Sequence, residues 1–278
     1  MPKPKRSTII IIAVILAVIL LFAVSKLFFE SGDQGEDSVE MESMNILILG
    51  TDARQGMTGR TDAIMLINYN PQKEDIYLLS IPRDTRIKIK NKYDRINAAY
   101  AYGGAELARE SIEEFLDIEI DHHVVFNFDA FVSLVDMIGG IEVDVPIRMY
   151  HPDENINLQP GLQLLDGEDA LAYSRFRYTS EGDIGRAKRQ QEVVKLVIDK
   201  LFKVRNVLKI PQLIQAISEN VEHDFSNTDL VKLASTANKA KEKPIISEVL
   251  PGKSEMLNAT WYIIPDLSQV PTISEKFK

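Results

Sequence analysis

The longest apolar run of the chain stands near its start, where residues 9–24 are sixteen consecutive apolar residues. With its flanking residues, the segment 7–29 reaches 23 residues. At about 1.5 Å per residue, a helix of that length is roughly 34 Å long and can cross a hydrocarbon core of about 30 Å. The pattern therefore predicts one transmembrane helix over residues 9–29.

Charge is distributed unequally on the two sides of this segment. Residues 1–8 carry three cations and no acid, whereas residues 30–43 carry acids and no cation. The positive-inside rule then predicts a cytoplasmic tail over residues 1–8, a signal anchor in the cell membrane and an extracytoplasmic linker over residues 30–43. Residues 23–25 also fit a cleavage site, but the length of the apolar run favours an uncleaved anchor over a signal peptide.

Beyond the linker, short apolar runs alternate with segments of helical periodicity. Runs typical of buried strands cover residues 44–49, 63–69, 76–81, 122–128 and 141–145. Residues 86–90 alternate as an edge strand does, and residues 261–264 fit a closing strand. Helical spacing covers residues 105–116, 129–137, 167–174, 183–204, 208–221 and 228–240. Alternating strands and helices predict an α/β domain with a mixed sheet covered by helices.

Composition excludes several classes of function. The net charge of −9 disfavours nucleic-acid binding, and the absence of cysteine excludes thiolate metal sites and a cysteine nucleophile. The sequence contains no serine-hydrolase elbow, no phosphate-binding P-loop and no dinucleotide-binding glycine motif. The adjacent His122 and His123 face opposite sides of a strand, and no histidine pair has zinc-ligand spacing, so we expect no zinc site.

Two carboxylates stand at strand ends. Asp52 follows the first predicted strand, and Asp62 opens the second. Adjacent strands joined by the intervening loop would bring the two side chains together, and paired carboxylates are a usual way of holding Mg²⁺ beside phosphate oxygens. The alternative is that Asp52 caps a turn and Asp62 is a solvated charge.

Cations gather around the start of the helix predicted over residues 183–204. Asp183 is expected to cap this helix, and Arg186, Arg189 and Gln190 share one face by their spacing. Cations near a helix N-terminus oppose its dipole, which disfavours stability but suits an anion site. Arg60, Arg83, Arg86, Arg175 and Arg177 are further candidates, the alternative for each being a solvated arginine or a surface ion pair.

Six motifs in order resemble those of the LytR–CpsA–Psr family. They are LGTDAR (49–54), GRTDAIML (59–66), SIPRDTR (80–86), RINAAYAYGG (95–104), LDGEDALAYSRFR (165–177) and GDIGRAKRQQ (182–191). The resemblance implies a three-layer α/β/α catalytic domain over residues 44–278, with the motifs in residues 44–205. It also implies Mg²⁺-dependent transfer of a polyprenyl-pyrophosphate-linked glycopolymer, of teichoic acid or capsule type, onto peptidoglycan, with release of polyprenyl phosphate.

The resemblance assigns roles to the motif residues. Asp52 and Asp62 would hold the metal. The expected catalytic residues of the motifs are Arg60, Arg83, Arg86, Arg175, Arg177, Arg186 and Arg189. Asp84 is added as a candidate for the general base because it stands beside Arg83. Asp183, Gln190, Asn97 and Arg95 are expected to bind substrate, and Arg95 stands where the family often has lysine. An apolar slot for the lipid could draw on Leu107, Phe115, Phe131, Leu134, Val194 and Val197, although each is also a plain core residue.

A non-catalytic reading stays open. The protein could be a polyprenyl-phosphate-binding envelope protein with a regulatory role. The retained Asp52, Asp62 and Arg186 favour the enzyme, because an anion binder does not need the two carboxylates.

The charge asymmetry around residues 9–29 gives a test of topology. Protease added to intact protoplasts should degrade the body of the protein and leave a small membrane-bound fragment, because the body is predicted to lie outside. Immunoblots against tags at the two ends check this. A body that survives until the membrane is permeabilised would contradict the predicted orientation.

Overall fold

The computed structural model describes residues 43–51, 59–70, 72–73, 75–203, 221–226, 229 and 244–278. Among these residues, none of the helices combines the length and the apolar character that a membrane span needs. The anchor predicted over residues 9–29 lies outside the described residues and stays a prediction. Nearly all of the predicted linker, and most of the two helices predicted over 208–221 and 228–240, also lie outside the described residues. Val221 is described, and it begins a strand.

A six-stranded sheet forms the centre of the molecule, in the order β11-β6-β1-β2-β3-β12. Its strands are β1 (Met44–Thr51), β2 (Thr61–Tyr69), β3 (Ile76–Ser80), β6 (His122–Phe126), β11 (Val221–His223) and β12 (Ile245–Val249). β1 pairs in parallel with β6, as β3 does with β12, whereas the other three pairings are antiparallel. The predicted mixed sheet is confirmed.

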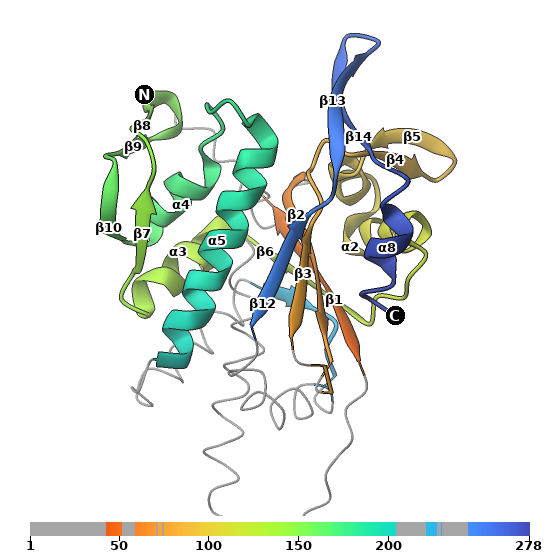
Figure 1. Cartoon of the computed structure of the whole chain (residues 1–278), viewed down its shortest axis with the longest axis horizontal. Helices are drawn as coiled ribbons and strands as arrows, with labels where there is room; N and C mark the ends of the chain where they lie inside the picture. Colours follow the sequence, from red (N-terminus) through yellow and green to blue (C-terminus); the bar gives the residue numbers. More distant parts are fainter. Residues whose placement is uncertain are drawn as a thin grey trace, which may run out of the picture.

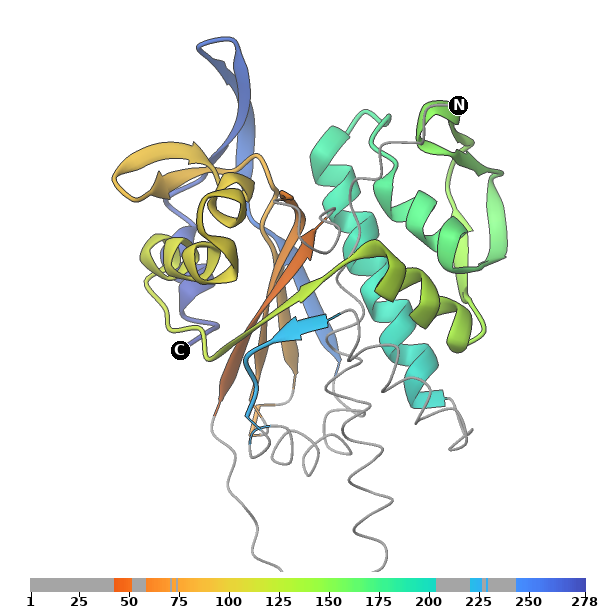
Figure 2. The ribbon, with the colours of Figure 1, turned by 180° about the vertical axis from the view of Figure 1, so that it is seen from behind.

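Helices cover both faces of this sheet (Figures 1 and 2). One face carries α2 (Asn97–Leu116) and α8 (Val270–Ser274). The other carries α3 (Phe128–Met137), α4 (Gly167–Arg175) and α5 (Gly182–Lys203). Alternate residues of β1 serve two separate cores, Ile46 and Ile48 in one, Leu47 and Leu49 in the other. Burial on both faces explains why the central strands are continuous apolar runs.

The remaining strands form hairpins outside the central sheet. β4 (Arg86–Ile89) pairs with β5 (Lys92–Arg95), and β13 (Gly252–Leu257) pairs with β14 (Thr260–Pro265). β7 (Ile141–Val145) pairs with β10 (Gly161–Leu165), and β8 (Met149–His151) pairs with β9 (Ile156–Leu158) beside the short helix η1 (Pro152–Glu154). Residues 261–264 are thus a hairpin strand, and they do not close the sheet.

Helix α2 begins eight residues earlier than its predicted start at residue 105. The break expected at Gly103 and Gly104 is present, since neither glycine has helical angles, but a further helical segment precedes it. Buried Ala98 and Ala99 pack that segment against the core. The extension places the first residue of α2 beside the turn that follows β3.

Several strand ends and the start of a helix lie at one end of the sheet. The C-terminal ends of β1 and β3 meet the start of β2 there, at the upper end in Figure 2. Helix α5 also begins at this end. The C-terminal end of parallel strands is a usual place for a ligand site, because loops and helix starts converge on it.

Close packing of α3 on α4 gives a test of the fold. A Cβ atom at Gly167 would lie 2.4 Å from the carbonyl oxygen of Val132, so Gly167→Ala must push the two helices apart. We expect a loss of about 1–3 kcal/mol in the free energy of unfolding, measured in urea. Glu168→Ala, at the exposed next position, is the control and should stay within about 0.5 kcal/mol. Equal stability of both variants would contradict the packing.

Candidate active site

Three carboxylates surround the Arg83 guanidinium at the end of the sheet. Asp62, buried at the start of β2, forms an ion pair with Arg83 Nη1. Asp84 Oδ2 and Asp183 Oδ1 lie 3.5 and 4.0 Å from Arg83 Nε. Arg83 therefore joins the start of β2, the turn after β3 and the first turn of α5.

Electrostatics hold Arg83 in its charged form. Burial opposes the charge and lowers the pKa, but the carboxylates of Asp62, Asp84 and Asp183 outweigh it, so the pKa of Arg83 is raised. A guanidinium matched by several carboxylates is a structural element as well as a possible phosphate ligand.

Arg186 lies beside this cluster in a less favourable environment. Only 3% of the residue is exposed, and its Nη2 lies 2.6 Å from Asp183 Oδ1. Burial, followed by repulsion from Arg83, lowers the pKa of Arg186, although Asp183, Asp62 and Asp84 oppose the shift. A buried cation that its surroundings disfavour is one that a bound anion would stabilise.

The predicted capping role of Asp183 is wrong. Helix α5 begins at Gly182, so Asp183 is already its second residue. Its carboxylate contacts Arg186, which is three residues further along the same helix. The side chain therefore compensates the buried arginine.

Arg189 and Gln190 extend the polar surface of α5. Arg189 Nη2 donates a hydrogen bond to the carbonyl of Phe176, and burial lowers the pKa of Arg189. Arg189 Nε and Gln190 Nε2 are buried and find no hydrogen-bond acceptor within the described part of the chain. Buried donors of this kind usually have a partner, so these two suit an acceptor-rich ligand.

Arg95 and Asn97 form an outer layer around Arg83. Arg95 Nη1 lies 3.3 Å from Asp84 Oδ1, on the carboxylate that also faces Arg83. The Asn97 backbone N–H donates to the Arg83 carbonyl over 3.2 Å. The contacts of both residues orient the Arg83 turn.

The structure distributes the other predicted arginines more widely. Arg175 and Arg177 lie 3.5 and 3.9 Å from the carboxylate oxygens of Glu154. The Arg86 guanidinium lies 4.1 Å from the centre of the Tyr93 ring, on the β4–β5 hairpin. Arg60 is exposed directly before β2. Arg175 and Arg177 thus pair with Glu154, a carboxylate that does not belong to the group around Arg83.

The register of β1 and β2 bears on the predicted metal pair. Thr51, the last residue of β1, pairs with Thr61, which directly precedes Asp62. Asp52 itself lies outside the described residues. Asp62 is paired with Arg83 in the described structure, and the Mg²⁺ ligand pair expected at Asp52 and Asp62 stays a prediction.

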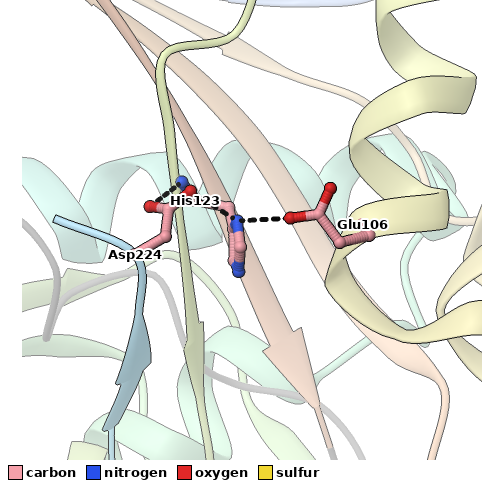
Figure 3. Close-up of side chains that lie close together, drawn as sticks. All are labelled: Glu106, His123 and Asp224. Atoms are coloured by element: carbon pink, nitrogen blue, oxygen red, sulfur yellow. Dashed lines mark hydrogen bonds and ion pairs between the residues drawn. The ribbon is translucent and has the colours of Figure 1, made fainter.

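Sequence reasoning missed a second cluster of charged groups. Glu106, His123 and Asp224 point toward one another from α2, β6 and the residues after β11 (Figure 3). The expectation of no zinc site rested on the spacing of histidine pairs, which does not address a cluster of one histidine with two acids. Ligand spacing along the chain could not find it, because the three residues come from distant segments.

Comparison with known proteins places the chain in a family. The LytR_cpsA_psr family matches residues 28–278. The chain belongs to this family. A relative, the polyisoprenyl-teichoic acid–peptidoglycan teichoic acid transferase TagU of Halalkalibacterium halodurans, is 34% identical over 251 residues, or 88% of this chain and 82% of TagU.

Solved structures of the LytR_cpsA_psr fold agree with this assignment. The crystal structure of B. subtilis TagV superposes with a TM-score of 0.73 at 33% identity, covering 85% of this chain and 96% of TagV. A structure described as TagT bound to LI-WTA gives a TM-score of 0.72 at 30% identity, covering 88% of this chain and 95% of TagT. The family resemblance seen in the sequence motifs is confirmed.

The apolar slot expected for a lipid is not formed as a set in this LytR_cpsA_psr domain. Leu107 and Phe115 belong to the core under α2, whereas Phe131, Leu134, Val194 and Val197 belong to the core on the opposite face of the sheet. The four residues of the second group are essentially fully buried. They are packed core residues, so their apolar character reflects folding.

Arg83 and Arg186 should differ in their effect on stability. Arg83→Met removes the cation beside buried Asp62 and should cost about 3–5 kcal/mol in the free energy of unfolding. Arg186→Met fills the same space without a buried charge, and Asp183 is partly exposed, so stability should be unchanged or raised. Urea denaturation of both variants tests this. An equal loss in both would mean that Arg186 is a structural ion-pair residue.

Proposed function

We propose that this protein is a Mg²⁺-dependent phosphotransferase that moves a polyprenyl-pyrophosphate-linked anionic glycopolymer onto peptidoglycan and releases polyprenyl phosphate. The transferase class follows from the family and from the names of TagU and TagV. The observation that carries the proposal is the buried Arg186, held next to a carboxylate-bound Arg83 at the end of the sheet.

The arginines supply what a pyrophosphate needs. Phosphoryl transfer requires little covalent chemistry but much charge neutralisation and positioning. Arg186 and Arg189 carry cationic charge on one helix, with the buried Gln190 amide beside them as a further donor. A guanidinium can grip two phosphate oxygens at once, which fixes the orientation of the bond to be broken.

The carboxylates have a different task. Asp62, together with Asp52, is assigned to hold Mg²⁺, which when bound neutralises charge on the pyrophosphate oxygens. Asp84 lies between Arg83 and Arg95, and we assign it to orienting these two side chains. Arg60, Arg86, Arg175 and Arg177 are assigned to the saccharide end of the donor or to the acceptor.

The proposed substrate places the protein at the outer face of the cell membrane. A polyprenyl tail stays in the bilayer, so an enzyme that acts on its headgroup benefits from an anchor of its own. The apolar segment 9–29 and the cations before it support a single-pass protein whose N-terminus is cytoplasmic. The linker up to residue 43 would then hold the catalytic domain near the bilayer.

Turnover by the purified full-length protein tests the proposal. The donor is a polyprenyl-pyrophosphate-linked saccharide, the acceptor is a peptidoglycan glycan, and the release of polyprenyl phosphate is measured with Mg²⁺ and with chelator. Arg186→Met should lower kcat about 10²–10³-fold, the usual loss for one preorganised donor. Arg186→Lys should restore little, because an ammonium cannot grip two oxygens. Asp62→Asn should remove the response to Mg²⁺.

Lys188→Met is the matched control, because Lys188 is an exposed cation on the same helix. Its turnover should equal that of the unchanged protein. Donor binding without release of polyprenyl phosphate, with or without Mg²⁺, would instead support the non-catalytic binder. Normal turnover of Arg186→Met would remove the arginine from the mechanism.

A further inference from the structure

Glu106, His123 and Asp224 lie together although three separate segments supply them (Figure 3). His123 Nδ1 is 3.0 Å from Asp224 Oδ2 and 3.9 Å from Glu106 Oε1. The imidazole is buried, whereas Glu106 is exposed and Asp224 is partly so. The cluster therefore has a fixed base in the sheet and an opening to solvent.

Each carboxylate has one oxygen held by another donor. Arg109 Nη2 donates to Glu106 Oε2 over 2.7 Å, and the His123 backbone N–H donates to Asp224 Oδ1 over 2.8 Å. The second oxygen of each carboxylate is the one nearest to His123 Nδ1. Outer hydrogen bonds that orient ligand atoms in this way are typical of metal sites.

The imidazole nitrogen at the centre has carboxylate oxygens nearby but no hydrogen bond in the described part of the chain. His123 Nδ1 is buried and makes no hydrogen bond within the described residues, even though Asp224 Oδ2 is close. When Nδ1 is the unprotonated nitrogen, it and the two carboxylate oxygens are all acceptors, and converging acceptors repel one another. A cation between them removes this repulsion.

The distances between the three ligand atoms and the types of these atoms indicate which cation the cluster would bind. An ion bound at about 2.0–2.2 Å needs ligand atoms within roughly 4.4 Å of one another. Nδ1 meets this limit with both oxygens, and all three atoms lie within 4.8 Å. The exposed Glu106 side chain can close the remaining gap. Imidazole with carboxylates suits Zn²⁺ or a similar transition metal, whereas Mg²⁺ prefers oxygen ligands alone.

We propose that Glu106, His123 and Asp224 form a divalent transition-metal site of the zinc type, separate from the magnesium ligands proposed at Asp62. The ion would join α2, strand β6 and the chain after the edge strand β11. Arg109 offsets one of the two carboxylate charges, so the site is closer to neutral than two acids alone would make it. With three protein ligands and one side open to solvent, it holds the ion and stabilises this corner of the fold.

Calorimetric titration of the full-length protein tests the site. The protein is first treated with chelator and then titrated with ZnCl₂ in excess Mg²⁺. We expect one Zn²⁺ per chain, which Mg²⁺ does not displace. Glu106→Gln should lower the affinity at least about tenfold, because the loss of even an outer-shell partner costs about 10–100-fold. The exposed Glu110 on the same helix gives the matched control Glu110→Gln, which should bind as the unchanged protein does.

Cobalt provides a readout that a merely structural cluster would not give. Co²⁺ bound to the unchanged protein should show visible absorption that His123→Gln and Glu106→Gln lack, and Zn²⁺ should raise Tm only where the site is intact. Glu106→Gln keeps the test decisive if His123→Gln does not fold, because Glu106 is exposed. Absence of Zn²⁺ binding, or equal binding by Glu106→Gln and Glu110→Gln, would overturn the proposal and leave a plain His123–Asp224 ion pair.

Discussion

The structure depends on how charge is balanced around Arg83. Three carboxylates contact this guanidinium, and each belongs to a different part of the fold: the start of β2, the turn after β3 and the start of α5. A buried charge is tolerated only when it is paired, so the positions of these segments are coupled. Burial and, after it, repulsion from Arg83 lower the pKa of Arg186, whereas the three carboxylates outweigh burial at Arg83 and raise its pKa.

The unfavourable environment of Arg186 links the stability of the fold to the proposed chemistry. A protein selected for stability alone would replace Arg186 by an apolar side chain, because a buried cation costs more than packing of similar volume. The two-sided sheet can support such a residue, since apolar contacts on both faces hold β1 to β3 in place. A preorganised cation of this kind is effective toward an anion because it needs no reorganisation when the anion binds.

Sequence patterns predicted the central strands and missed β13 of the outer hairpin, because the two differ in burial. Residues 44–49, 63–69 and 76–81 are buried on both faces, so their apolar runs are unmistakable. Residues 252–257 are largely exposed, and nothing in their pattern indicates a hairpin. Spacing also placed Arg186 on an anion-binding helix start, but it could not show that only 3% of the residue is exposed. Its burial arises from packing against the end of the sheet, which no local pattern contains.

Contacts between residues that are far apart in the sequence could not be predicted from sequence patterns either. Arg83 and Asp62 are both in motifs, but their ion pair depends on the antiparallel register of β2 and β3. The contact of His123 with Asp224 spans 101 positions and follows from β11 lying beside β6. Spacing rules for metal ligands describe sites on one helix or loop, and they do not apply to a cluster that a sheet assembles.

The acidic character of the whole chain does not conflict with an anionic substrate. The net charge of −9 includes the acids of residues 30–43, and exposed charges further than about 10 Å from the site are largely screened at 0.1 M salt. Buried charges are screened much less, so Arg186 and Arg189 contribute strongly to the local potential, together with the buried Asp62. Burial therefore increases the electrostatic contribution of these arginines at the site relative to that of the exposed acids. It does so only because the fold already fixes the positions of the arginines.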